Sequence, residues 1–106
     1  MKKIILSIAG ALFLIGLSFA DEQKHSFKPE QGFVPDEKTA IAIAVAVWSP
    51  IYGEKKIKSE KPFKATLTNG VWHVEGTLPI KYAEGGVAEA EISKNDARIL
   101  RISHGK

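Results

Sequence analysis

Cysteine is absent from this chain of 106 residues, and one methionine and nine aromatic residues are present. The fold therefore cannot depend on a disulfide or a thiolate metal site, and a cysteine nucleophile is excluded. A strong net charge is also missing once the first twenty residues are set aside. Two of the fifteen basic side chains, at positions 2 and 3, lie in that segment, ahead of a long apolar run. Without them, 13 basic side chains face 12 acidic ones. This near balance, with no basic patch interleaved with aromatics, predicts no nucleic-acid partner.

The first twenty residues have the pattern of a secretory signal peptide. Lys2 and Lys3 form a basic start, residues 4–17 are uncharged, and Ser18 and Ala20 place small residues before a cleavage point after Ala20. The run is short for a bilayer span, so a cleavable signal is favoured over an uncleaved anchor. We expect a periplasmic or otherwise exported protein without stable membrane association after cleavage.

The remaining chain divides into a leader and one small domain. Residues 21–32 are polar and contain Pro29 and Gly32, which predicts a flexible leader. Residues 33–106 are predicted to form a single α+β domain with one core.

The stretch "TAIAIAVAVWSP" (residues 39–50) alternates apolar residues, yet alanine favours helices over strands. Acidic residues precede it where a helix dipole favours them, and Pro50 disfavours helical geometry in the residue before it. We therefore predict a helix over residues 35–48. One apolar stripe would join Ile41, Val45 and Trp48, with a second on the opposite flank, so a curved surface must surround the helix.

A hairpin follows, with strands over residues 62–69 and 71–78 around the turn Asn69-Gly70. A two-residue turn pairs Thr68 with Val71. The inner face then carries the pairs Leu67–Trp72 and Ala65–Val74, and the outer face carries Lys64–Glu75 and Thr66–His73.

A second hairpin is predicted over residues 86–93 and 98–104 with a three-residue loop at 95–97. That loop pairs Ile92 with Leu100 and Ala90 with Ile102 inside, and Glu91 with Arg101 and Glu89 with Ser103 outside. Its last residue, Ala97, would adopt a left-handed conformation at a cost on the order of 1 kcal/mol.

The expected architecture is one long N-terminal helix packed on a curved four-stranded antiparallel meander. The residues predicted to form its core are Ile41, Val45, Trp48, Leu67, Trp72, Val74, Ile92, Leu100 and Ile102.

No pattern of catalytic, cofactor-binding or metal-ligating residues emerges from the sequence. His25 lies in the leader, His104 lies on the last strand, and His73 faces outward beside Thr66. Glu89 and Glu91 share a face, but acid and base catalysis by a carboxylate pair needs a cleft, and this face is convex. We predict a non-enzymatic protein without a cofactor.

Several stretches resemble one known family: "GFVPDEKTAIAIA", "VWSPIYGE", "KPFKATLTNGVWHVEGTLP" and "GGVAEAEISKNDARILRISHGK". They are similar to bacterial immunity proteins with a nuclear-transport-factor-2-like (cystatin-like) fold, from polymorphic toxin systems. The resemblance covers residues 32–106, with two departures. Ala97 stands where the family generally has glycine, and residues 80–84 look longer than the family's loop.

The resemblance implies a non-catalytic protein that binds a cognate protein toxin and blocks it. A standard interface would bury roughly 1,200–2,000 Å². The candidate contact residues are Tyr82 and Glu84 in the loop, and His73, Glu75 and Glu91 on the outer sheet face.

Two other functions remain open at this level. One is a periplasmic small-molecule-binding or enzymatic domain that uses a pocket between Trp48, Trp72 and Leu100. The other is a module like a protease inhibitor or pro-domain that docks through a sheet edge.

Overall fold

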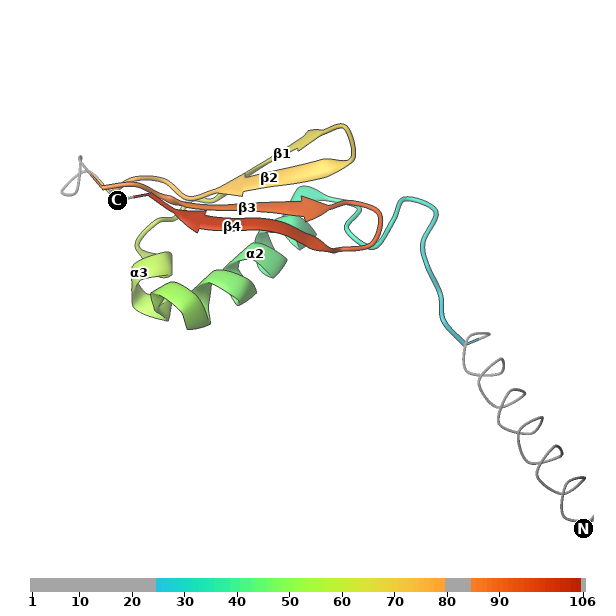
Figure 1. Ribbon diagram of the computed structural model, residues 1–106, viewed down its shortest axis with the longest axis horizontal. Coiled ribbons are helices and arrows are strands. Elements are labelled where there is room, and N and C mark those ends of the chain that lie inside the picture. Colours follow the sequence, from blue (N-terminus) through green and yellow to red (C-terminus); the bar gives the residue numbers. More distant parts are fainter. Residues whose placement is uncertain (1–24, 80–84, 106) are drawn as a thin grey trace, which may run out of the picture.

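A computed structural model describes residues 25–79 and 85–105 of the chain. Helix α2 (Glu37–Tyr52) and the short helix α3 (Glu54–Lys58) precede four strands, β1 (Lys64–Thr68), β2 (Val71–Glu75), β3 (Ala88–Ser93) and β4 (Ile99–His104). The strands form one antiparallel sheet in the order β1-β2-β3-β4, and both helices lie on the same face of it (Figure 1). The predicted α+β architecture is confirmed. Among the described residues, no helix is long and apolar enough to cross a membrane.

Helix α2 begins two residues later than predicted, because Asp36 serves as its N-cap. The Asp36 Oδ1 atom accepts a hydrogen bond of 2.8 Å from the Thr39 amide. Hydrogen bonding from the Thr39 side chain, and then from the Thr39 backbone, holds the pKa of Asp36 below its ordinary value. The carboxylate is thus the stable form at the positive end of the helix dipole.

The end of α2 differs from the prediction, because the helix continues past Pro50 to Tyr52 and stops at Gly53. Gly53 has a φ of 99°, and its amide donates to the Ser49 carbonyl at 2.9 Å. Proline removes one amide donor, but the helix extension lets the Tyr52 ring pack 5.2 Å from the ring of His104. Packing of this kind offsets the local preference against helix before proline.

The face of α2 that meets the sheet is lined by Ala40, Ala44 and Trp48, which are fully buried. Ile41 and Val45, predicted to join Trp48 at the centre of the core, instead flank this line and are partly buried. The small alanines allow the helix backbone to approach the sheet. The Trp48 indole Nε1 atom then donates a hydrogen bond of 3.1 Å to the Glu89 carbonyl on β3.

The register of the first hairpin is as predicted, and both strands are shorter than predicted. β1 begins at Lys64 and not at residue 62, and β2 ends at Glu75 and not at residue 78. Thr68 pairs with Val71 across the Asn69-Gly70 turn, and all four further pairs follow from that turn. The rigid two-residue turn leaves one register that separates apolar from polar faces.

The second hairpin is partly as predicted. The pairs Ala90–Ile102, Glu91–Arg101 and Glu89–Ser103 form, but Ile92 pairs with Ile99 instead of Leu100, because a bulge interrupts the ladder. Ala97 has a φ of 65°, the left-handed conformation predicted for it.

Two residues expected in the core are exposed at the sheet edges instead. Leu67 and Leu100 each retain 43% of their accessible surface, whereas Trp72, Val74 and Ile92 are buried and Ile102 is partly buried. Leu67 lies near the end of edge strand β1, and Leu100 lies at the bulge of edge strand β4. Helix α2 packs mainly on β1, β2 and β3 and less on β4.

The segment before α2 is tied to the sheet at the β3–β4 turn. The amides of Phe33 and Val34 donate to the carbonyls of Asn95 and Lys94, each at 3.0 Å. Val34 is fully buried, and its carbonyl accepts a hydrogen bond of 2.8 Å from the Trp72 indole. The flexibility proposed for residues 21–32 stays a prediction.

Candidate functional site

The outer sheet face carries a block of four polar side chains on β2 and β3. His73 and Glu75 alternate along β2, and Glu91 and Glu89 lie directly opposite them on β3. The predicted hairpins placed these residues on the outer face, but only the pairing between the hairpins brings them together. Strand alternation points all four away from α2.

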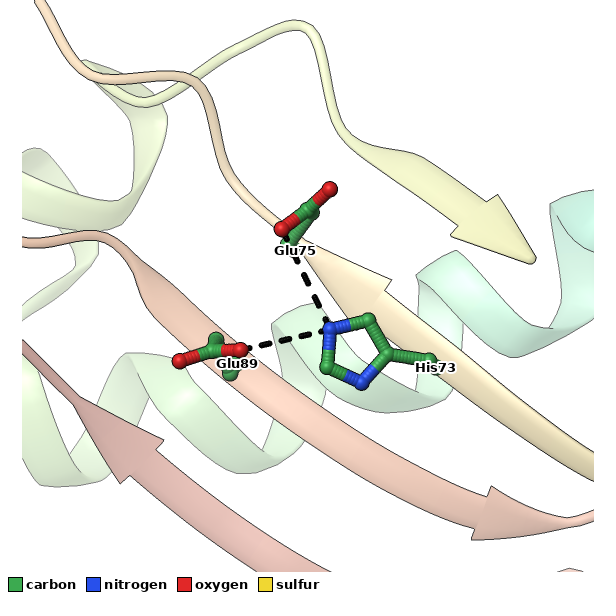
Figure 2. Close-up of side chains that lie close together, drawn as sticks. All are labelled: His73, Glu75 and Glu89. Atoms are coloured by element: carbon green, nitrogen blue, oxygen red, sulfur yellow. Dashed lines mark ion pairs between the residues drawn. The ribbon is translucent and has the colours of Figure 1, made fainter.

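Three carboxylates surround the imidazole of His73, as Figure 2 shows for two of them. The His73 Nε2 atom lies 3.3 Å from Glu89 Oε1 and 3.9 Å from Glu75 Oε2. The other ring nitrogen, Nδ1, lies 3.8 Å from Glu91 Oε2. Each of these four side chains is between 32% and 40% exposed, so solvent reaches the cluster from one side.

The carboxylates of this cluster repel one another. Glu75 and Glu89 face each other across β2 and β3, and like charges in directly opposed positions destabilise a sheet. Lys64 and Arg101 are the cross-strand neighbours of Glu75 and Glu91. Within residues 25–79 and 85–105, the ion pairs of these carboxylates all involve His73 and neither flanking cation.

The same block places three potential metal ligands together. One ligand atom from each of His73, Glu75 and Glu89 lies within 4.8 Å of the other two. Nothing in the sequence predicts metal ligands here, because none of these residues is spaced for chelation on one helix or one strand with a third partner. Cross-strand pairing of β2 with β3 supplies the missing partner.

Of the five predicted contact residues, His73, Glu75 and Glu91 lie together in this block. Tyr82 and Glu84 lie outside the described residues. Glu89, which the sequence placed on the same face but not among the contacts, makes the shortest ion pair with His73.

A second polar cluster is buried beneath the sheet. Glu60 is 2% exposed, and its Oε1 atom accepts a hydrogen bond of 2.7 Å from the Ala88 amide. Its Oε2 atom lies 2.7 Å from His104 Nε2, and His104 Nδ1 lies 2.6 Å from the Gly105 carbonyl. Both nitrogens of His104 and both oxygens of Glu60 are thereby engaged. The sequence offered no signal for this pair, which is separated by 44 positions.

The structure contains a hollow of about 740 Å³ beside this buried pair and a smaller one of about 330 Å³ between α2 and α3. The larger hollow is lined in part by Tyr52, Glu60 and His104. The sequence suggested a pocket between Trp48, Trp72 and Leu100, but none of these residues lines either hollow. Both tryptophans are packed in the core and Leu100 is exposed.

Residues 39–106, which include the whole sheet and most of α2, match the sequence profile of the family described as NTF2 fold immunity protein. The chain belongs to this family. Its relatives include two proteins of Escherichia coli (strain K12), uncharacterized protein YhhH and uncharacterized protein YbbC. YhhH is 37% identical over 76 residues, which cover 72% of this chain and 60% of YhhH. YbbC is 38% identical over 74 residues, which cover 69% of this chain and 60% of YbbC.

The chain spans about 60% of the length of these two relatives. No solved structure matches it. The matched region contains both polar clusters, the outer one on β2 and β3 and the buried one at Glu60 and His104.

Proposed function

We propose that this protein is an exported, non-catalytic immunity protein that binds a cognate toxin and blocks it with the outer face of its sheet. Membership of the immunity family supports the general role. The observation that carries the proposed surface is the block of His73, Glu75, Glu89 and Glu91, which presents ionisable groups on a sheet backed by a helix.

The two faces of the sheet are suited to different tasks. The inner face is filled by α2, with Trp48, Val74 and Ile92 at the centre of the core. The outer face is available across β2 and β3, where the backbone is fixed by ladders on both sides. A surface whose backbone is already ordered loses little conformational entropy on binding.

The charge of the block indicates the kind of toxin surface it would meet. Three carboxylates around one imidazole attract a partner patch rich in lysine or arginine, and such complementarity raises the association rate and the specificity. Tyr82 and Glu84 are the further contacts predicted from the sequence, and tyrosine is a common interface anchor.

The proposal that the protein acts without catalysis is supported by the buried pair. Both nitrogens of His104 and both oxygens of Glu60 have hydrogen-bond partners within the protein, so the pair has a structural role that needs no substrate. The hollow itself has a volume typical of small-molecule sites. A periplasmic small-molecule-binding domain is therefore the second candidate.

The proposed site of action is outside the cytoplasm, because residues 1–20 have the pattern of a signal peptide. The toxin would then be met in the periplasm, either at its target there or in transit.

The test is to co-express the tagged full chain with each protein encoded next to its gene and to purify it from the periplasmic fraction. We expect a stoichiometric partner that is toxic when expressed alone and harmless when co-expressed. Purification of the chain without such a partner, together with thermal stabilisation by a metabolite that fits the hollow, would instead favour the small-molecule function.

The surface is tested by charge reversal. Glu75→Lys combined with Glu91→Lys should weaken binding at least about tenfold, because it places two cations opposite a basic patch. Glu30→Lys, a single charge reversal at an exposed position in the segment before α2, is the control and should bind as the unaltered protein does. If the double variant and the control bind the toxin with equal affinity, the toxin does not bind the outer sheet face.

A further inference from the structure

The block on the outer sheet face has the arrangement of a metal site as well as that of a charged surface. From its geometry we propose that His73, Glu75 and Glu89 bind one divalent first-row transition-metal ion, with Zn²⁺ the best fit. In this proposal Glu91 is a positioning residue that orients the imidazole of His73.

The first support is the distance between ligand atoms. Zinc binds imidazole nitrogen and carboxylate oxygen at about 2.0–2.2 Å, so two ligands of a tetrahedral ion lie about 3.3–3.5 Å apart. His73 Nε2 and Glu89 Oε1 are 3.3 Å apart, which already matches this spacing. Glu75 Oε2 lies 3.9 Å from the same nitrogen and needs to close by only about half an ångström, a small rotation for a partly exposed side chain.

The second support is the use of the two ring nitrogens. Nε2 faces the two carboxylates that would share the ion, whereas Nδ1 faces a third carboxylate, that of Glu91, at 3.8 Å. Histidine ligands commonly bind a metal through one nitrogen and donate the N–H of the other to a carboxylate, which fixes the tautomer. The block therefore contains both the ligands and the group that would orient one of them.

The third support is electrostatic. The opposed pair Glu75 and Glu89 repel each other, and the neighbouring Lys64 and Arg101 make no ion pair with the cluster in the described part of the chain. A divalent ion between the carboxylates would replace this repulsion with attraction. The exposed side of the block leaves room for water as a fourth ligand.

The ligand types select the class of metal. A single imidazole with two carboxylates suits zinc and its first-row neighbours, whereas calcium and magnesium prefer oxygen ligands alone. The ladders of β2 and β3 fix the Cα positions of all three ligands, so little backbone ordering is needed when the ion binds.

The test is a calorimetric titration of the purified full chain with ZnCl₂, after treatment with a chelator and its removal. We expect one saturable site per chain, with affinity unchanged by excess Mg²⁺ or Ca²⁺. His73→Ala, Glu75→Gln and Glu89→Gln should each weaken binding at least about tenfold. His25→Ala, at an exposed histidine in the segment before α2, should leave the affinity unchanged.

The role of Glu91 has its own readout. Glu91→Ala should weaken zinc binding by about tenfold. Glu91→Gln should recover part of the loss, because its amide oxygen can still accept the Nδ1 proton. Nitrogen-15 spectra of the His73 ring should show metal binding at Nε2 and the proton at Nδ1. Equal effects of the two Glu91 variants, or metal at Nδ1, would overturn the positioning role.

Absence of a saturable zinc site, or one that survives His73→Ala, would overturn the proposal and leave the carboxylates as partners of the His73 imidazole alone. The titration needs only the metal and the chain. Its outcome is therefore independent of whether a toxin binds to the outer sheet face.

Discussion

Replacement of Glu60 by alanine should destabilise the protein more than any other single change of a charged side chain described here. The carboxylate is 2% exposed and accepts from the Ala88 amide and from His104, each at 2.7 Å. Its removal leaves a buried amide and a buried imidazole without their partner. Removing one partner of a buried carboxylate–imidazole pair in this way costs about 3–5 kcal/mol.

Glu60→Gln separates the loss of charge from the loss of hydrogen bonds. The glutamine oxygen can accept from the Ala88 amide, and its NH₂ group can donate to Nε2 of a neutral His104, whose Nδ1–H still donates to the Gly105 carbonyl. Only the charge assistance is lost, so we expect a cost of about 1–2 kcal/mol. Glu54→Ala is the matched control, because Glu54 is exposed and its 3.7 Å ion pair with Lys58 contributes at most about 0.5 kcal/mol.

The assay is urea unfolding followed by circular dichroism, with thermal midpoints as a second measure. At about 4–8 °C per kcal/mol for a domain of this size, Glu60→Ala should lower the midpoint by more than about 12 °C. If the free energies of unfolding of Glu60→Ala and Glu54→Ala differ by less than about 1 kcal/mol, the buried carboxylate does not stabilise the fold as described. The same conclusion follows if Glu60→Gln lowers the free energy of unfolding as much as Glu60→Ala does.

Three smaller predictions concern backbone conformation, close packing and pH. Ala97→Gly should raise the free energy of unfolding by about 0.5–1 kcal/mol, because glycine adopts a φ of 65° without strain. Ala42→Gly, at an exposed position of helix α2, should lower the free energy of unfolding by a similar amount. Urea titrations that give both changes the same sign would contradict this prediction. Gly76→Ala should destabilise the protein, since its Cβ would lie 2.6 Å from Glu60 Oε1, and a double-mutant cycle should show a smaller loss in the Glu60→Ala background. The pKa of Asp36 is lower in the folded state, so Asp36 stabilises the fold above its unfolded-state pKa, and this stabilisation is lost as the pH falls through its folded-state pKa. The unaltered protein should therefore be more stable than Asp36→Asn at neutral pH but not in strong acid. A difference in stability that persists in strong acid would argue against the helix cap.

The sequence predicted the full register of the first hairpin, and that of the second except beside its bulge, because the length of each turn limits how the strands can pair. The Asn69-Gly70 turn fixed every pair between β1 and β2, and the left-handed Ala97 followed from the length of its loop. The bulge at Leu100 was not predictable in the same way. It depends on how β4 adjusts at the edge of the sheet, where α2 packs less closely than on the other three strands.

The candidate site was predictable only in part, because it depends on contacts between elements. Hairpin alternation placed His73, Glu75 and Glu91 on the outer face, but the distances among them come from the pairing of β2 with β3, which no turn specifies. The buried pair of Glu60 and His104 joins a loop to the last strand, so neither partner has a local signature. Likewise, the continuation of α2 through Pro50 reflects the packing of Tyr52 and contradicts the local preference.

The two tryptophan hydrogen bonds provide two intrinsic probes of local opening in the protein. The chain has two indole N–H groups, and each donates to a backbone carbonyl of a different element: Trp48 to Glu89, and Trp72 to Val34. In a nitrogen-15 spectrum these appear as two resolved signals whose exchange with deuterium depends on separate openings. Exchange at Trp48 reports separation of the helix from the sheet, and exchange at Trp72 reports release of the segment that precedes the helix. Any change that a bound partner causes in either opening would therefore be measured without a label at the surface it covers.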